Sequence, residues 1–326
     1  MKMKKPAVSV VIEGYNESLS LGSSKDAIEA LKKQDFPLEL VELIFVGKSA
    51  QADAFEKRYG KGSPFFGVKS IAADGAHYYE LKNIGGNSAS SKVVALIDSD
   101  AYPQPGWLST IVKGVESGAD LTAGLTLFES EYFKPDNFLM QAAASITWGF
   151  VAKKVNVSPL PANGILSHNL GLNAETFRRC QYRTDLGRTC AGFFLYKSLK
   201  QSGGKMILQP GQRVVHSFSF LWWLTRLHVR FGHEVFLLRR LDKEFFHSWL
   251  SKLTLVEPLM TMLGSIVMDV PQWLRFSALL GVSSWRRFSL IPIVIVLSSG
   301  ARFSELVGMY LTWIAPDRMR RFALRN

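Results

Sequence analysis

The stretch that decides the fold is Val93-Val94-Ala95-Leu96-Ile97-Asp98-Ser99-Asp100. Five aliphatic residues in a row predict a strand buried on both faces, as in a parallel sheet covered by helices. Two carboxylates then stand at the carboxyl edge of that strand, where ligands bind in open α/β sheets. Such a pair suits a hard divalent cation with positions left open for a diphosphate. Asp and Ser also form ordinary strand-ending turns, so the motifs in the rest of the chain must distinguish a metal site from a simple turn.

Strands and helices alternate around this stretch. Strand-like runs lie at residues 8–12, 40–46, 67–72 and 121–126, and helix-like segments at 27–31, 50–59, 80–91 and 108–116. This alternation predicts an α/β fold with a parallel sheet. Part of a helix is expected at 195–199, and two short strands at 205–208 and 214–216, which close the domain.

The composition narrows the classes of protein. The 326 residues suffice for one catalytic domain and an appendage but not for two complete enzymes. The mean hydropathy of +0.08 predicts that some surface meets lipid. The formal charge is +12, yet no zinc-finger spacing, recognition-helix pattern or RNA-binding aromatic motif accompanies it. A nucleic-acid partner is therefore not expected, and an anionic membrane surface explains the charge better.

The cysteines and the N-terminus indicate the compartment. Cys180 and Cys190 are too few for a disulfide framework or a structural zinc site, so we expect buried thiols in a reducing compartment. Glu13 and Glu17 cut the first apolar run short of a signal peptide. The first strand is therefore expected to face the cytosol.

The last third of the chain has a different character. Residues 218–241 mix aromatic residues with arginines, as in an interfacial amphipathic helix. The apolar segments 253–281 and 288–313 contain charges that interrupt an 18-residue span. Arg302 and Glu305 lie three apart and are expected to pair if that segment is helical. A re-entrant or spanning hairpin, helices lying on the bilayer, and a helical subdomain packed on the catalytic core all stay open. The expected domains are residues 1–216 and 217–326.

Several segments together resemble the family 2 glycosyltransferases, and the resemblance covers roughly residues 8–216. It rests on motifs in the family's order and spacing: Val8–Glu17, Leu81–Asn87, Asp98–Asp100 with Pro103, Pro105, Gly106, Trp107 and Leu108, His168–Leu172, and Leu199, Gly203, Pro210 and His216. The resemblance implies a GT-A fold, with a Rossmann-like, mostly parallel central sheet and flanking helices. A C-terminal helical membrane-associated region is expected to follow.

The resemblance also implies an activity and a site. The expected reaction is inverting transfer of a sugar from a nucleotide-diphosphate sugar to a lipid-linked or saccharide acceptor, at the inner membrane with the catalytic domain facing the cytosol. The implied cofactor is Mg²⁺ or Mn²⁺. Asp98, Asp100 and His216 are the expected metal ligands, and the residues expected to bind the sugar nucleotide are Glu13, Tyr15, Asn16, Glu17, Lys82, Asn83, Asp98 and Ser99.

Two departures from the family pattern concern carboxylates. Val46-Gly47-Lys48-Ser49 stands where many members have an acidic pair, and Glu13 is a possible substitute. Ala191-Gly192 stands where the family usually carries a Glu-Asp pair that supplies the general base. An acceptor hydroxyl must lose its proton to such a base. Asp185 is the nearest acidic residue and our predicted catalytic base, ahead of Glu129 and Glu131. The alternative is that Asp185 is a solvated loop carboxylate or a helix cap with no catalytic role.

Other classes of function stay open. A non-catalytic relative that binds a sugar nucleotide or a partner subunit would explain both departures. A nucleotidyltransferase is disfavoured, because no glycine-rich basic loop, P-loop or G-x-G-x-x-G motif follows the first strand.

Overall fold

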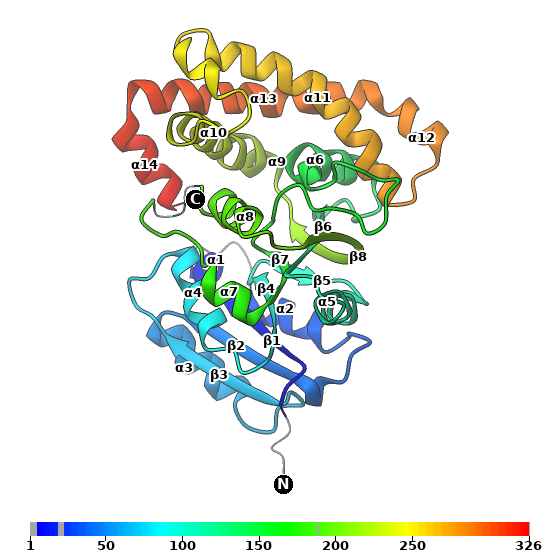
Figure 1. Ribbon diagram of the computed structural model, residues 1–326, viewed down its shortest axis with the longest axis vertical. Coiled ribbons are helices and arrows are strands. Elements are labelled where there is room, and N and C mark those ends of the chain that lie inside the picture. Colours follow the sequence, from blue (N-terminus) through cyan, green and yellow to red (C-terminus); the bar gives the residue numbers. More distant parts are fainter. Residues whose placement is uncertain (1–4, 19–22, 187, 189, 326) are drawn as a thin grey trace. The chain divides into compact units, whose positions relative to one another are not determined.

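The computed structural model describes residues 5–18, 23–186, 188 and 190–325 (Figure 1). The chain divides into two compact units. Unit 1 comprises Met1–Leu127, Val151–Gly187 and Ala191–Ser217, and unit 2 comprises Phe128–Phe150, Arg188–Cys190 and Phe218–Asn326. The last boundary between the two units, after Ser217, lies one residue beyond the predicted domain boundary at 216. Residues 128–150, expected within the first domain, group instead with the C-terminal helices.

Unit 1 is built on an eight-stranded sheet with the order β3-β2-β1-β4-β7-β6-β8-β5. The strands are β1 (Val8–Glu13), β2 (Val41–Gly47), β3 (Gly67–Ala72), β4 (Val93–Asp98), β5 (Ala101–Pro103), β6 (Leu121–Glu129), β7 (Asn169–Asn173) and β8 (Met206–Ser217). The expected α/β class is confirmed. The two strands expected at 205–208 and 214–216 are one continuous strand, β8.

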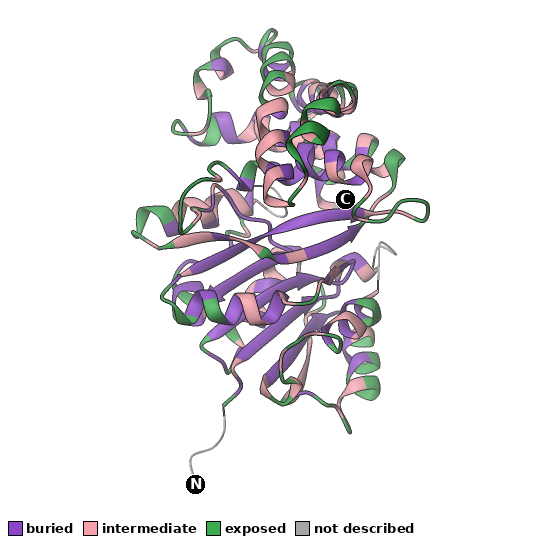
Figure 2. Ribbon diagram, turned by 90° about the vertical axis from the view of Figure 1, so that its right-hand side faces the viewer, coloured by how far each residue is buried: buried purple, intermediate pink, exposed green. Residues whose placement is uncertain are grey.

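The sheet is mixed, with one parallel half. β3, β2, β1 and β4 run parallel to one another. β7 is antiparallel to both β4 and β6, and β5 is antiparallel to β8. The chain enters β7 at the edge where β4 ends, so these two strands run in opposite directions. β1, β2 and β4 are buried along their whole length (Figure 2), as their aliphatic sequences predict.

The helices of unit 1 include α4, which positions part of the site. They are α1 (Tyr15–Ser18), α2 (Ser24–Leu31), α3 (Ser49–Tyr59), α4 (Tyr78–Asn87), α5 (Trp107–Glu116), α7 (Ala174–Arg179) and α8 (Ala191–Gln201), with a 3-10 turn at Leu38–Leu40. α4 packs directly on β1. A Cβ on Gly85 would lie 2.3 Å from a methyl carbon of Val11, and one on Gly86 would lie 2.1 Å from the ring of Phe177. Only glycine permits this close approach.

Unit 2 is helical. Its helices are α6 (Phe138–Trp148), α9 (Phe220–Trp222), a π-helical segment (Trp223–His228), α10 (Val229–Leu241), a 3-10 segment (Ser248–Lys252), α11 (Glu257–Leu279), α12 (Ser284–Ser289), α13 (Ile291–Ile314) and α14 (Pro316–Arg325). A further 3-10 turn, Gly149–Val151, follows α6. α11 and α13 pack against each other and both pack on α6 (Figure 1). Among the described residues, α13 alone is long and apolar enough to cross a membrane by length and composition.

α10 and α13 cross with their backbones in direct proximity. A Cβ on Gly232 would lie 2.0 Å from the carbonyl oxygen of Glu305, and one on Gly308 would lie 2.0 Å from that of Val229. The crossing therefore requires glycine on both helices.

A chain of buried charges connects α11, α13 and the π-helical segment. Arg302 donates two hydrogen bonds to Asp269, at 2.7 and 2.8 Å, and one to Glu305 at 2.5 Å. Glu305 also pairs with Nδ1 of His228 at 2.8 Å. Asp269 is 2% exposed and Glu305 5% exposed. The predicted pairing of Arg302 with Glu305 is confirmed, as is the burial of Cys180 and Cys190 as free thiols.

Candidate functional site

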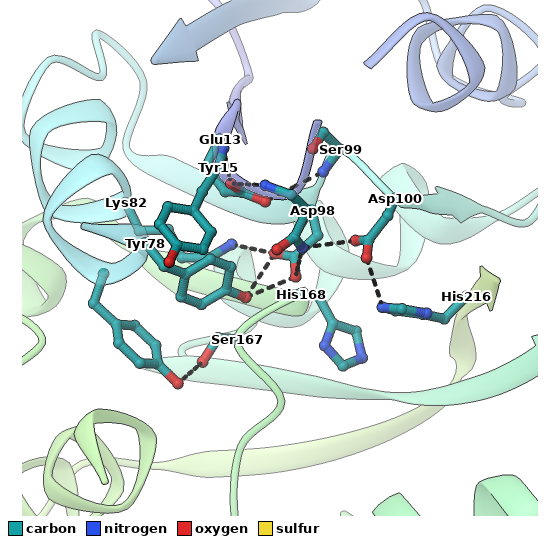
Figure 3. A network of polar contacts seen from close by, with 12 residues as sticks. Glu13, Tyr15, Tyr78, Lys82, Asp98, Ser99, Asp100, Ser167, His168 and His216 are labelled. Carbon is teal, nitrogen blue, oxygen red and sulfur yellow. Dashed lines mark hydrogen bonds and ion pairs between the residues drawn. The ribbon is translucent and has the colours of Figure 1, made fainter. Parts of the chain in front are cut away.

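The carboxyl ends of β1 and β4 bring two acidic residues side by side. Glu13 and Asp98 are partners in the parallel register of these strands. The Glu13 carboxylate is fully buried and accepts hydrogen bonds from the backbone N–H groups of Tyr15 at 2.5 Å, Asn16 at 3.3 Å and Ser99 at 3.4 Å (Figure 3). Glu13 therefore holds the loop after β1 against the loop after β4.

The side chain of Asn16 hydrogen-bonds to both aspartates of the Asp98-Ser99-Asp100 motif. Its side-chain amide donates to Asp100 at 2.9 Å and to Asp98 at 3.2 Å. The next residue, Glu17, donates its backbone N–H to the Ser99 hydroxyl at 3.1 Å, and its carboxylate accepts from Ser24 at 3.0 Å. Glu13, Asn16, Glu17, Asp98, Ser99 and Asp100 thus form one hydrogen-bonded group, and their binding of a ligand stays a prediction.

α4 supplies a buried cation and a phenol to Asp98. The Lys82 ammonium donates to Asp98 at 2.6 Å, and the Tyr78 hydroxyl lies 2.7 and 2.8 Å from its two carboxylate oxygens (Figure 3). Lys82 is fully buried, and Asp98 is 3% exposed. A charge removed from water to this extent requires an opposite charge. Lys82, predicted to bind the sugar nucleotide, lies at the site as the partner of Asp98.

Asp100 pairs with a histidine from β8. Its carboxylate lies 3.2 Å from Nε2 of His216, whose Nδ1 lies 2.9 Å from the carbonyl oxygen of Ser217. Burial would raise the pKa of Asp100, but the charge of His216 and the hydrogen bonds from His216 and Asn16 outweigh it and lower this pKa to about 2. Burial would lower the pKa of His216, but Asp100 reverses this and raises it to about 9. An acceptor therefore faces each ring nitrogen, as an imidazolium requires.

Asp100 offers one carboxylate to a divalent cation, and the side chains around it are already paired with one another. Among the residues described, no three His, Cys, Asp or Glu side chains are grouped so as to hold a metal. Asp98 is engaged by Lys82 and Tyr78, whereas Asp100 is paired directly with Nε2 of His216, which would have to give up its proton before it could bind a cation. Carboxylate oxygen suits Mg²⁺ and Mn²⁺, and imidazole nitrogen suits transition metals better than Mg²⁺. A metal-binding role of Asp98, Asp100 and His216 stays a prediction.

Two predicted residues have other partners. The Asn83 side chain exchanges hydrogen bonds with the backbone of Tyr182, at 2.9 and 3.1 Å, and so fixes that loop to α4. Asp185, the predicted base, is an exposed carboxylate 2.5 Å from Arg183, and that hydrogen bond lowers its pKa. Of the further candidates, Glu129 pairs with Lys134 at 2.7 Å and Glu131 is exposed. A catalytic role of Asp185 stays a prediction.

The structure also brings residues to the site that the sequence reasoning missed. Tyr15, Tyr78, Tyr79 and Tyr182 form a row with ring centroids 6.2, 4.8 and 4.7 Å apart, and Ser167 donates to the Tyr79 hydroxyl at 3.3 Å. Of this row, only Tyr15 was predicted. Tyr78 lies one helical turn before Lys82, a spacing that could have revealed it. Aromatic rings beside a carboxylate cluster offer stacking surfaces for a base or a sugar.

His168 is a second buried imidazole next to the cluster. Its Nε2 lies 2.9 Å from the Thr126 hydroxyl, and its ring lies 5.6 Å from that of His216 (Figure 3). Burial lowers the pKa of His168 to about 4, so this ring is neutral at neutral pH while His216 is charged. The residue occurs in the His168–Leu172 motif, but its side chain was not among the predicted site residues.

Comparison with known proteins supports the resemblance. No protein-family model matches the chain. The chain is 27% identical over 160 residues to glycosyltransferase AglE of Haloferax volcanii, a match that covers 47% of this chain and 52% of AglE. It therefore spans about half the length of the curated relative it matches.

Two solved structures show the same fold over most of the chain. Mannosyltransferase PcManGT from Pyrobaculum calidifontis, in complex with GDP-Man and Mn²⁺, has a TM-score of 0.56 and 14% identity, with 97% of this chain and 89% of that chain covered. Residues 1–349 of S. aureus TarS have a TM-score of 0.50 and 13% identity, with 95% and 92% covered. At these identities the likeness concerns the fold. The expected resemblance is confirmed: the fold is of GT-A type, and the chain is similar to the family 2 glycosyltransferases.

Proposed function

We propose that this protein transfers a sugar, with inversion, from a nucleotide-diphosphate sugar to an acceptor. The observation that carries the proposal is the buried cluster at the ends of β1 and β4, in which Asp98 and Asp100 are fixed by Lys82, Asn16 and His216. It lies at the edge of the parallel strands, where such folds bind ligands. The names of AglE and PcManGT, both glycosyltransferases, support the same activity.

Different residues of the cluster would contact different parts of the sugar-nucleotide donor. Asp100 and His216 would hold Mg²⁺ or Mn²⁺, and the imidazole favours Mn²⁺. When bound, the cation neutralises the charge that develops on the leaving diphosphate. Asp98, already paired with Lys82, would contact the ribose or a water of the metal. Glu13, Asn16, Glu17, Asn83 and Ser99 would shape the nucleotide loop, and Tyr15 and Tyr78 would offer their rings to the base or the sugar.

Inversion needs a group that takes the proton of the acceptor hydroxyl on the face opposite the diphosphate. We propose Asp185 for this role. The hydrogen bond from Arg183 lowers its pKa and so weakens it as a base, and Asp185 would have to leave Arg183 to take the proton of the hydroxyl.

A second function is favoured by the start of α8. Ala191 and Gly192 occupy the place of the family's acidic pair, and a Cβ on Gly192 would lie 3.7 Å from the Ser167 hydroxyl and 3.8 Å from that of Tyr79. The position adjoins the aromatic row and has room for a side chain. A protein without a carboxylate here would bind a sugar nucleotide without transferring the sugar.

The acceptor is proposed to be a lipid-linked or saccharide molecule at the cytoplasmic face of the inner membrane. The support comes from the apolar length of α13 and from the excess of basic over acidic residues after Ser217.

The first test is metal-dependent release of nucleoside diphosphate from UDP-, GDP- and TDP-sugars by detergent-solubilised protein, with membrane extract as acceptor. We expect release from one donor, lost by about 100-fold or more in Asp100→Asn and retained in the exposed control Asp53→Asn. Equal rates in both variants would refute the site. Donor binding without release, together with turnover in Gly192→Asp, would establish the non-catalytic alternative. Loss of rate in Asp185→Asn with donor binding intact would identify the base.

A further inference from the structure

We propose that unit 2 docks in the plane of an anionic lipid bilayer through one apolar face, formed by α11, α12 and the first half of α13. We name it the docking face and define it by Leu259, Leu263, Val267, Trp285, Phe288 and Val296. The inference rests on the membrane association proposed above and not on sugar transfer, so it is testable without a donor.

The docking face consists of large apolar side chains that unit 2 leaves exposed. On α11, Leu259, Leu263 and Val267 follow one another at intervals of four residues and are 44%, 51% and 70% exposed. This spacing aligns them along one side of the helix. Val296 of α13 is 72% exposed. α11 and α13 pack on each other and both pack on α6, so these exposed side chains lie on sides of the helices that this packing leaves uncovered. Several large, exposed apolar side chains on neighbouring helices are typical of an interaction site.

α12 joins these two helices and has the composition of a membrane-interface segment. Trp285 is 82% exposed and Phe288 is 59% exposed, with Arg286 and Arg287 between them. Tryptophan favours the headgroup level of a bilayer, where its ring is partly apolar and its N–H reaches polar groups. Arginine beside it meets lipid phosphates.

The charge around the docking face is one-sided. Between residues 270 and 316 the only acidic residue is Glu305, which is buried in an ion pair with Arg302, whereas Arg275, Arg286 and Arg287 are basic. α14 adds the exposed Arg318, Arg320 and Arg321 against one exposed carboxylate, Asp317, so the balance stays basic. Apolar side chains framed by arginines complement anionic headgroups over an acyl layer, and a protein partner would be expected to show acidic rim residues as well.

The buried charges of unit 2 favour docking in the plane over spanning. The middle of α13 holds Arg302 and Glu305 in the network with Asp269 and His228. α13 also packs along α10, whose Arg239 and Arg240 pair with Glu257 at 3.2 and 2.7 Å. Passing α13 through the hydrocarbon layer would carry these packed charges with it, at a high desolvation cost. Lying flat, α13 buries only its apolar side.

The test is co-sedimentation of the full chain with vesicles, without any sugar nucleotide. The double variant Leu263→Glu/Val267→Glu puts two carboxylates on the docking face, and Phe66→Glu alters a comparably exposed apolar residue of unit 1. We expect binding to phosphatidylglycerol-containing vesicles to weaken about tenfold or more in the double variant and to stay unchanged in the control. Both substitutions are at exposed positions, and equal melting temperatures would establish that folding is intact.

Two further measurements fix the mode of binding. Arg286→Ser should weaken binding to phosphatidylglycerol vesicles but not the residual binding to pure phosphatidylcholine. Alkaline carbonate should release the wild-type protein from native membranes. Equal vesicle binding of the double variant and the control would overturn the docking face, and retention through alkaline extraction would overturn the in-plane arrangement. Loss of sugar transfer with vesicle binding intact would count against the proposed activity alone.

Discussion

Lys82 is a fully buried cation, and Asp98 lies 2.6 Å from it. Removing one partner of a buried pair leaves the other charge without compensation, which costs about 3–5 kcal/mol. We therefore expect Lys82→Met to lower the free energy of unfolding by this amount, measured by urea denaturation of the full chain. The exposed Lys92→Met should change it by less than about 0.5 kcal/mol. Similar values for the two variants would contradict the pairing.

At the level of single residues, the sequence predicted the carboxylates better than their partners. Asp98 and Asp100 could be placed because an aliphatic run ends there, and strand ends of this type are ligand edges. The pairing of Lys82 with Asp98 depends on how closely α4 lies on β1, and this distance is set by Gly85 against Val11. Such a contact between distant segments leaves no local pattern, so the pairing was not predicted, and the expected role of Lys82 in binding the sugar nucleotide stays a prediction.

The close crossing of α10 and α13 predicts how glycine substitutions in these helices affect stability. Gly308→Ala would place a Cβ 2.0 Å from the backbone of Val229, and the helices would have to separate, which we expect to cost about 2 kcal/mol or more. The same change at Gly264, in the interior of α11, meets no atom within 4 Å and should stabilise the protein by up to about 1 kcal/mol through helix propensity. Thermal unfolding of both variants measures the difference. A stabilising Gly308→Ala would show that the crossing is looser than described.

Most elements could be predicted from the sequence because their apolar periodicity is strong. The strand expected at 67–72 is β3, and the helix expected at 108–116 is α5, which begins one residue earlier. β8 was divided wrongly, because Pro210-Gly211 has the composition of a turn. In the structure these residues continue the strand. Pairing within the sheet thus overrides the local signal.

For the molecule as a whole, buried neutral histidines predict sensitivity to acid. Burial lowers the pKa of His233 from 6.5 to about 4. As the pH falls from 6.5 toward 4, the unfolded chain binds a proton that the folded protein does not, so stability is lost in this range. The loss from His233 amounts to about 3 kcal/mol. Among the described residues, Nε2 of His233 has no hydrogen-bond partner, so a proton there would be uncompensated.

The matching variant is His233→Gln, which keeps a polar group near Thr312. We expect its stability to decline less than that of the wild type between about pH 7 and pH 4.5, in urea unfolding at both pH values. Parallel declines in the two proteins would assign the acid sensitivity to other groups. His168, whose pKa is also about 4, contributes equally to both proteins and does not affect the comparison.

Unit 2 is assembled from separate segments, since α6 belongs to it while the strands β7 and β8 that follow belong to unit 1. During synthesis, α6 leaves the ribosome long before α11 and α13, on which it packs. The buried side chains of α6 that α11 and α13 cover stay exposed until those helices have been synthesised. Nascent chains halted before α11 should therefore be held by chaperones and be prone to aggregate. Unit 2 is completed only when the C-terminal helices have emerged, so its folding is a late and largely post-translational event.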